Sequence, residues 1–276
     1  MKNALESGMA TMNGLLPWKQ FIKRFKEHRQ KNTEIPDQPD RAYNSVKQLI
    51  RLLRSGDTVL ELGCLPAFIP VAMDAAGILD KVQYYGTCVE DESDFQYVYA
   101  LSLGIKLLRL NLDPLYALPS QISNLSNSLD IQDGTIDLVI MAEVMEHLVW
   151  PHSALAEVAR VLKHEGSLWG STPNATDIGL VLRALLGIRA FTYYDCCYLS
   201  NTPDANRADV RYYDRGEIKQ LLRAHGLVLS DLNYHSDIDP HVSGSRAKRL
   251  LRNTVRKLTD TIPWWRQGIY FVARRV

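Results

Sequence analysis

From about residue 58 onward, short β-favouring apolar runs alternate along the chain with amphipathic segments of helical period. Seven such runs predict strands, at Thr58–Leu62, Val82–Val89, Ile105–Leu110, Ile136–Ala142, Ser167–Ser171, Leu227–Leu232 and Gly268–Arg274. Because strands that alternate with helices form βαβ units, this order predicts an α/β fold whose parallel sheet carries helices on both faces. Gly77, Gly104 and Gly166 stand where the intervening helices are expected to end in left-handed caps.

Two further amphipathic helices are predicted ahead of the first strand. The segment Leu15–Lys31 mixes aromatic with basic residues, and Asn32–Asp40 contains two prolines that end it. Asp40 is expected to cap a second helix that ends at Ser55-Gly56 and lies against the sheet. We therefore divide the chain into an N-terminal helical extension, residues 1–40, and a domain that spans residues 41–276.

Two insertions decorate the second half of that domain. An amphipathic segment at Asp177–Phe191 runs into a polar stretch, so that residues from about 175 to 210 are expected to form a lid over the carboxyl ends of the strands. Residues from about 243 to 260 form the second insertion, and they include six basic residues between Arg246 and Lys257. This segment 246–257 predicts a basic helix, which either packs on its own domain or contacts an anionic membrane surface together with Trp264 and Trp265.

Composition narrows the class of protein. A chain of 276 residues with 46% hydrophobic and 23% charged residues is typical of a globular protein, and its net charge of +1 argues against a nucleic-acid partner. The four cysteines form no CxxC pair, which favours reduced thiols in a cytoplasmic protein. No apolar run reaches the ~18 residues of a membrane span, so membrane contact would be peripheral. The sequence gives no indication of the oligomeric state.

Acidic residues follow the first two predicted strands, where ligands of open α/β sheets bind. The first strand ends in Glu61 and a turn at Gly63, and this arrangement favours a nucleotide-like ligand. Glu90 follows the second strand and is a candidate for binding ribose hydroxyls, although Cys88 could occupy that position instead. Asn111 follows the third strand and could supply an amide to a base.

The exit of the fourth strand carries Glu143, Glu146 and His147, which places three titratable groups at the same edge. His147 is a candidate general base because the ordinary pKa of histidine lies near neutrality. The alternative is a histidine that only hydrogen-bonds a neighbouring loop. Pro151 lies between His147 and His152 and breaks the single helical face that a two-histidine metal site uses, so no metal site is predicted.

Four motifs resemble a known family. They are VLELG at residues 59–63, GTIDLVIMAEVMEHL at 134–148, RVLKHEGSLWGSTPN at 160–174 and RYYDRGEIKQLLRAHGL at 211–227. In this order they resemble the class I S-adenosylmethionine-dependent methyltransferases, in the branch with ubiquinone-biosynthesis and polysaccharide-cluster enzymes. The resemblance implies a Rossmann-like, doubly wound sheet of seven strands, mostly parallel with an antiparallel last strand. It also implies S-adenosylmethionine as the cofactor.

The resemblance also implies a role for individual residues. Those that would line the cofactor are Glu61, Gly63 and Cys64 at the methionine part, Glu90 at the ribose, Asn111 and Leu112 at the adenine, and Ala142 and Glu143 at the methyl-bearing side. One departure is visible in the first turn. Leu65 and Ala67 stand where many members have glycines, so the loop is expected to be reshaped.

The expected reaction is methyl transfer to an oxygen of a sugar, a glycan or another small metabolite. His147 would act as base with Glu143 and Glu146 behind it, and Arg211 would grip the acceptor. Tyrosines and an arginine of the lid would suit a polyhydroxylated ligand, namely Tyr193, Tyr194, Tyr198 and Arg207. Two alternatives stay open: a non-catalytic scaffold whose altered turn no longer binds the cofactor, and a sheet that binds a nicotinamide cofactor.

Overall fold

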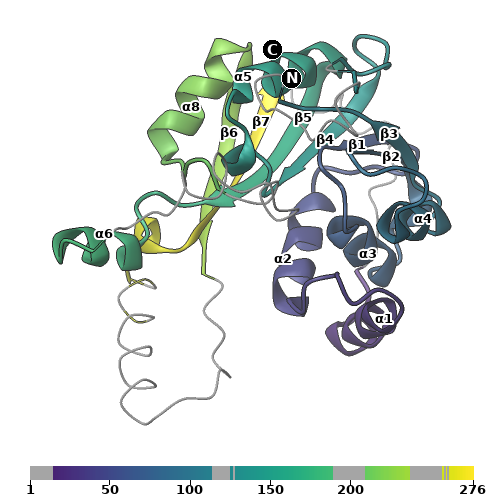
Figure 1. Ribbon diagram of the computed structural model, residues 1–276, viewed down its shortest axis with the longest axis horizontal. Helices are drawn as coiled ribbons and strands as arrows, with labels where there is room; N and C mark the ends of the chain where they lie inside the picture. The colour runs from purple at the N-terminus through teal and green to yellow at the C-terminus, as the bar shows by residue number, and fades with distance from the viewer. Residues whose placement is uncertain are drawn as a thin grey trace, which may run out of the picture.

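A computed structural model describes residues 15–113, 125–126, 128–188, 209–236, 257, 259 and 261–276. Its centre is one seven-stranded sheet in the order β3-β2-β1-β4-β5-β7-β6 (Figure 1). The strands are β1 Thr58–Glu61, β2 Gln83–Cys88, β3 Lys106–Arg109, β4 Ile136–Ala142, β5 Leu162–Pro173, β6 Leu227–His235 and β7 Gly268–Arg275. Strands β1 to β5 pair in parallel, whereas β7 runs antiparallel to both of its neighbours. The expected sheet is thereby confirmed.

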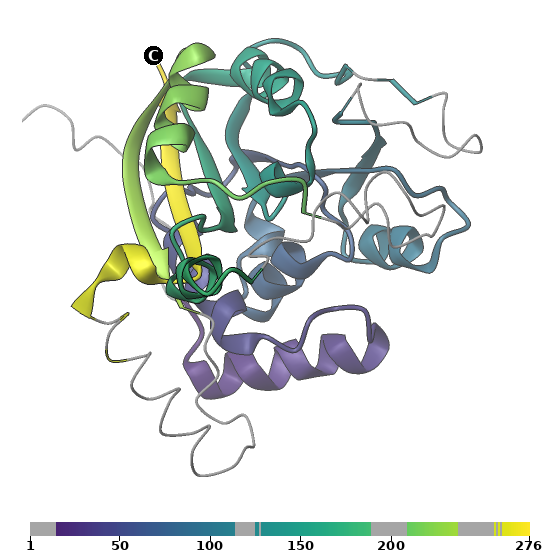
Figure 2. The ribbon, with the colours of Figure 1, turned by 60° about the vertical axis from the view of Figure 1, so that its left-hand side comes forward.

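Helices cover both faces of this sheet (Figures 1 and 2). On one side lie α1 Trp18–Lys31, α2 Pro39–Leu49, α3 Phe68–Ala75 and α4 Phe95–Ser102, and on the other lie α5 Pro151–Val161 and α8 Arg215–Ala224. The shorter elements are α6 Ile178–Leu185 and the 3-10 helices η1 Leu79–Lys81, η2 Met145–His147 and η4 Pro263–Trp265. Because β1 to β4 each lead into a helix or turn at one edge, that edge collects the loops that can form a site.

Alternation along the strands produces two separate hydrophobic clusters. Val59 and Ile140 face α1 to α3, while Leu60 and Val139 face α5 and α8. Each of these four side chains is fully buried, as expected for a parallel sheet that is covered on both faces.

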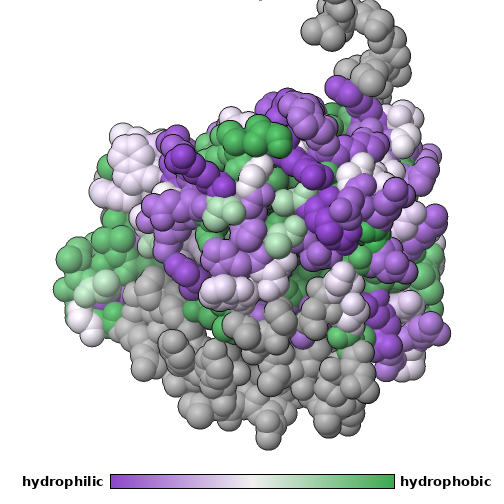
Figure 3. Space-filling model, turned by 90° about the horizontal axis from the view of Figure 1, so that it is seen from above, coloured by the Kyte–Doolittle hydropathy of each residue, from purple (hydrophilic) through white to green (hydrophobic). Residues whose placement is uncertain are grey.

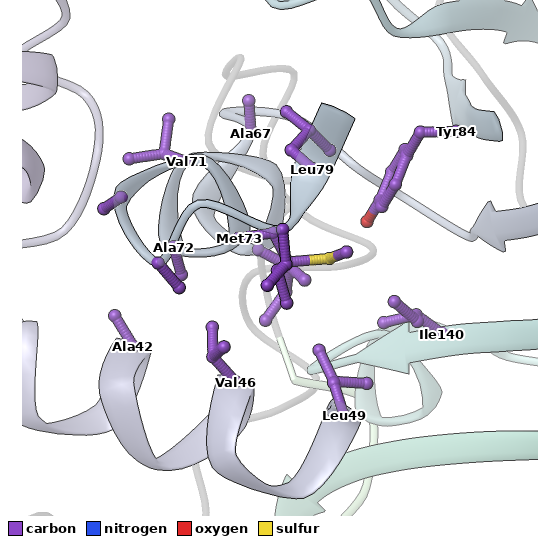
Figure 4. Packing of buried hydrophobic residues seen from close by; sticks show 14 of the residues in the cluster. Ala42, Val46, Leu49, Ala67, Val71, Ala72, Met73, Leu79, Tyr84 and Ile140 are labelled. Carbon is purple, nitrogen blue, oxygen red and sulfur yellow. The ribbon is translucent and has the colours of Figure 1, made fainter. Parts of the chain in front are cut away.

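The helices of the first cluster interlock closely. Figure 4 shows Val46 and Leu49 of α2 pointing toward Ala72 and Met73 of α3, all of them fully buried. Burial of a side chain the size of leucine or methionine stabilises the fold by roughly 1.5–3 kcal/mol relative to exposure. This packing holds α3 between α2 and the sheet.

Helix α1 belongs to the same cluster through Phe21 and Phe25, which are fully buried. A polar network fixes its far end, where His28 lies 2.8 Å from the Asp74 carboxylate through Nε2 and 2.8 Å from the Tyr99 hydroxyl through Nδ1. The hydrogen bond from His28 lowers the pKa of Asp74 from its usual value. The boundary at residue 40 remains a prediction.

Two boundary predictions were wrong for identifiable reasons. Helix α2 begins at Pro39 and ends at Leu49, so Asp40 lies within its first turn instead of capping it. Gly166 is not a helix cap, because α5 passes directly into the long strand β5 and the positive φ of 65° falls on Glu165. A bulge of β5 against β4 between Ile136 and Leu138 accompanies this change.

Parts of both insertions lie outside the described residues. The lid residues Tyr193, Tyr194, Tyr198 and Arg207 are among them, as is the basic segment from Arg246 to Arg256. Within the part of the chain that the structure describes, no helix is long and apolar enough to cross a membrane.

Candidate functional site

The loop from β1 to α3 is a tight, internally bonded turn. Gly63 has φ 62°, Ala67 has φ 66°, and the peptide bond before Pro66 is cis. The amide of Gly63 donates to Thr87 Oγ1 at 2.9 Å, and the amide of Cys64 donates to Thr87 O at 2.9 Å. In this structure both amides are therefore hydrogen-bonded to β2.

Cys64 is held by a close contact with β2. An added Cβ on Gly86 would lie 2.3 Å from Cys64 Sγ, so only glycine leaves room for this side chain. Burial raises the pKa of the Cys64 thiol well above its usual value. The side chain of Cys64 thus packs against the sheet, so only its backbone is available to the loop.

Glu61 lies beneath the loop. Its side chain is buried, and Oε2 accepts a hydrogen bond from the Tyr84 hydroxyl at 2.8 Å. Burial raises the pKa of Glu61 well above its usual value, while the Tyr84 bond opposes that shift. The expected role of Glu61 at the methionine part stays a prediction.

At the ends of β2 and β3, polar groups reach the same edge. Glu90 is half-buried two residues beyond β2, and its Oε2 accepts from the Val89 amide at 3.1 Å. Asn111 follows β3, where its side-chain oxygen accepts from the Asp113 amide at 3.1 Å, and Leu112 packs against the second hydrophobic cluster. The Cys88 thiol is buried, which raises its pKa to about 12, so Glu90 is the stronger ribose candidate of the two.

Asp113 fixes the neighbouring loop. Its buried carboxylate accepts from the amide of Val149 and, at 3.2 Å, from the amide of Trp150. Since Trp150 directly precedes α5, Asp113 ties the end of β3 to the start of that helix.

Glu143 follows Ala142 at the end of β4 in a strained conformation, with φ 53°. Its amide donates to Ser171 O at 2.9 Å, and its Oε1 lies 2.9 Å from Nη2 of Arg41 on α2. The Arg41 guanidinium also lies 5.8 Å from the centroid of the Phe68 ring at the start of α3. Helix α2 therefore brings a cation to the crevice between β1 and β4.

Glu146, His147 and Asp209 form a second polar group beside Glu143. Glu146 is buried and accepts from Thr172 Oγ1 at 3.1 Å, while Nδ1 of His147 lies 3.5 Å from Oδ1 of Asp209. Burial, and next the negative charge of Glu143, raise the pKa of Glu146 well above its usual value. Ligand atoms of these three residues lie within 4.8 Å of one another, a spacing that a metal could use and that the ion pair and hydrogen bond also explain. The absence of a metal site stays a prediction.

The side chain of Arg211 points to α8, although its backbone contacts Glu146. It is exposed, its Nη2 lies 2.5 Å from Oε1 of Glu217 in α8, and its guanidinium lies 4.9 Å from the Tyr213 ring centroid. Its amide, together with that of Val210, donates to the backbone oxygen of Glu146. The structure thus gives Arg211 a place outside the cavity described next.

A cavity of about 330 Å³ opens beside Glu143. It is lined by Glu143, Pro173, Asp177, Leu180, Tyr212, His235, Gln267 and Gly268. Most of these side chains are polar, and they come from the ends of β4, β5 and β6, from α6 and from the start of β7. The position and lining suit a small polar molecule.

Sequence reasoning named Glu143 here but missed His235 and Gln267, and it also missed Arg41, which pairs with Glu143. In the antiparallel pair, His235 stands opposite Gly268, so the end of β6 and the start of β7 share the edge where the parallel strands end. The His235 ring also occupies the space that a Cβ on Gly268 would fill. The antiparallel last strand was the signal that could have located both residues.

Comparisons with known proteins agree with this geometry. A family described as a methyltransferase domain matches residues 102–170. A curated protein from Streptomyces fradiae, described as an uncharacterized 37.1 kDa protein in transposon TN4556, is 27% identical over 152 residues. The match covers 55% of this chain and 40% of that protein, so the chain matches less than half of its relative's length.

Solved structures share the fold. One is a complex between the Haloferax volcanii Trm112 methyltransferase activator and a methyltransferase, with TM-score 0.56, 18% identity, and coverage of 93% of this chain and 97% of that one. Another is an S-adenosylmethionine-dependent methyltransferase from Archaeoglobus fulgidus, with TM-score 0.51, 13% identity, and coverage of 85% and 93%.

The matched segment of the chain runs from α4 through β4 to the middle of β5, and it contains the turn at Glu143. The sheet order with its antiparallel β7 extends the agreement to the rest of the domain. The matched segment is thus similar to a methyltransferase domain, and the chain shares the fold of solved S-adenosylmethionine-dependent methyltransferases.

Proposed function

We propose that the protein transfers the methyl group of S-adenosylmethionine to an oxygen of a small polyhydroxylated acceptor, such as a sugar unit of a glycan. The observation that carries this proposal is the polar cavity beside Glu143, at the edge where the family holds its cofactor. Hydroxyl-rich ligands need several donors and acceptors at once, and Asp177, Tyr212, His235 and Gln267 offer both.

The residues around the crevice fit the cofactor. A vicinal diol is bound well by a carboxylate, and Glu90 offers one that is half-buried at the end of β2. An amino-acid group needs a cation for its carboxylate, and our candidate is Arg41, which pairs with Glu143. We assign Asn111 and Leu112 to the adenine and the Gly63 turn to the methionine part, as the family resemblance implies.

S-adenosylmethionine supplies a methyl group that is already activated on a sulfonium, so the protein has to align the acceptor, exclude water and remove a proton. Correct alignment alone corresponds to an effective molarity of roughly 10⁵ M or more. The cavity lining performs this alignment in our proposal.

Two groups are our candidates for removing the acceptor proton. Glu143 lines the cavity directly, and His147 is oriented by Asp209 next to it. Glu146 is unsuited to this role because its side chain is buried against Thr172 and does not line the cavity. Its contacts with Thr172 and with the backbone of Val210 indicate that it supports the loop that carries His147.

Calorimetric titration with S-adenosylmethionine and S-adenosylhomocysteine tests the cofactor site, with Glu90→Ala as the site variant and Glu92→Ala, an exposed neighbour, as the matched control. We expect binding that Glu90→Ala weakens and Glu92→Ala leaves unchanged. An acceptor screen with sugars then follows. A loss of roughly 10²- to 10⁴-fold in turnover for Glu143→Gln or His147→Asn identifies the base.

One observation favours the alternative of a non-catalytic scaffold. The amides of Gly63 and Cys64 both bond to Thr87, so the turn offers a ligand fewer donors than a glycine-rich loop would. If neither ligand binds to the folded protein, the catalytic proposal fails and the scaffold takes its place. An activator subunit, as in the Haloferax volcanii complex, would then be the first partner to seek.

A further inference from the structure

Helix α6 presents apolar side chains to solvent along most of its length. Of its eight residues only Ile178 is buried. The exposed apolar residues of the helix and the turn after it are Val181 at 37%, Leu182 at 46%, Leu185 at 77%, Leu186 at 74% and Ile188 at 49%. A helix so exposed and so apolar marks a contact surface, because isolated surface leucines are common but a contiguous group is not.

Trp264 of η4 joins this group, although it lies some eighty residues further along the chain. Its backbone oxygen accepts from Asn174 Nδ2 at 2.9 Å and from Thr176 Oγ1 at 2.6 Å, just before α6 begins. Its own side chain is 55% exposed. Asn174 is fully buried, so the two elements are fixed to each other.

Figures 1 and 2 show α6 next to η4, and in Figure 1 both lie to the left of the sheet. In Figure 3 a hydrophobic patch lies at the left-hand edge, where Figure 1 places α6. We name the exposed residues Val181, Leu182, Leu185, Leu186, Ile188 and Trp264 the α6–Trp264 surface.

Positive charge flanks this surface. Arg183 lies on α6 itself and is exposed, and exposed Lys257 lies shortly before η4. Apolar side chains with a tryptophan and adjacent cations are the combination that suits the interface of an anionic membrane.

We propose that the α6–Trp264 surface docks on a bilayer that contains anionic phospholipid. A second copy of the chain fits less well, because a two-fold interface through the same surface would bring the basic residues of both copies together. The proposal does not depend on methyl transfer. Docking would nevertheless affect access to the cavity. Asp177 and Leu180, at the start of α6, line the cavity, so docking would bring the cavity close to the membrane.

Co-sedimentation of the full chain with vesicles tests the proposal. We compare phosphatidylcholine vesicles with mixed phosphatidylcholine–phosphatidylglycerol vesicles, using Leu185→Glu/Leu186→Glu as the surface variant. Both positions are mostly exposed, so the fold is expected to persist. The matched control is Val98→Glu, which changes a side chain of α4 that is 53% exposed and lies outside the surface.

We expect binding to the mixed vesicles alone, at least tenfold weaker in the surface variant and unchanged in the control. Each basic side chain near the bilayer contributes about fivefold, so added salt should weaken binding strongly. Equal partitioning of wild type and surface variant, or no binding to mixed vesicles, would overturn the proposal. So would light scattering that shows a dimer which the surface variant dissociates, because the surface would then belong to a second copy. Binding of S-adenosylhomocysteine, measured on the same samples, reports separately on the proposed function.

Discussion

The contact between Cys64 and Gly86 connects the stability of the sheet to the shape of the cofactor turn, and it can be tested by substituting both residues. A methyl group on Gly86 would lie 2.3 Å from Cys64 Sγ, 2.9 Å from Cys64 Cβ and 3.3 Å from Leu107 Cδ2. Atoms cannot approach this closely, so Gly86→Ala has to displace Cys64 or the strand. Overpacking of this kind costs about 1–3 kcal/mol of unfolding free energy.

Removal of the sulfur should relieve most of that conflict. Cys64→Ala alone loses one buried atom and costs about 1 kcal/mol. In the double variant the methyl of residue 86 occupies the place of the sulfur, and the approaches of 2.9 Å to the Cβ of residue 64 and 3.3 Å to Leu107 Cδ2 remain. We therefore expect the double variant to be more stable than the sum of the single effects predicts, by about 1 kcal/mol or more.

Urea unfolding of the four proteins measures this coupling, and titration with S-adenosylhomocysteine measures how the turn affects the affinity for the ligand. Gly86→Ala should weaken binding of the ligand, since Cys64 lies in the turn, and the double variant should recover part of the affinity. Gly104→Ala is the control for ligand binding, because its φ of 82° strains an added side chain that meets no neighbouring atom, and Gly104 lies between α4 and β3, outside the turn. Single effects that add within about 0.5 kcal/mol would refute the reasoning.

Three further outcomes are expected. Burial raises the pKa of Glu61, so the native state keeps a proton that the unfolded chain releases. The stability of the wild type therefore falls as pH rises above about 4.3. Glu61→Gln removes that loss, so its urea midpoint relative to wild type should be higher at about pH 8 than at about pH 5. Asp113→Ala leaves the amides of Val149 and Trp150 without their acceptor and should cost about 1–3 kcal/mol in the same assay, whereas a neutral result would remove Asp113 as the anchor of that loop. Arg211→Gln should lower stability by less than about 1 kcal/mol and leave turnover intact, because Arg211 pairs with Glu217 outside the cavity; a large loss of turnover would return it to the site.

The sheet was predictable from the sequence because each strand has a local pattern of apolar residues. A buried parallel strand such as Ile136–Ala142 is an almost unbroken apolar run, and its end fixes where Glu143, Glu146 and His147 can lie. The ends of the strands and the helix caps were harder to predict. The transition from α5 to β5 depends on pairing with β4, a contact that no local pattern around Gly166 contains.

The rest of the site depends on contacts between distant residues. Arg41 reaches Glu143 across about a hundred positions of the chain, and His235 reaches the edge only through the register of β6 on β7. Such pairs follow from the packed arrangement of whole elements, which a single sequence does not specify residue by residue. Cys64 shows the same limit, since its orientation is set by the glycine opposite it.

Glu143 offers a last test, in which stability and function should move in opposite directions. A non-glycine residue at φ 53° costs roughly 1–2 kcal/mol, and Glu143 keeps this conformation at the end of β4 while its side chain pairs with Arg41. Glu143→Gly relieves the backbone and loses the ion pair, whereas Glu143→Gln loses the ion pair alone. Since a partly exposed pair contributes about 0–1 kcal/mol, we expect the glycine variant to unfold at higher urea than the glutamine variant, by about 1 kcal/mol. Both should be impaired in methyl transfer if Glu143 contacts the acceptor. A glycine variant that is the less stable of the two would show that the conformation of Glu143 carries no strain.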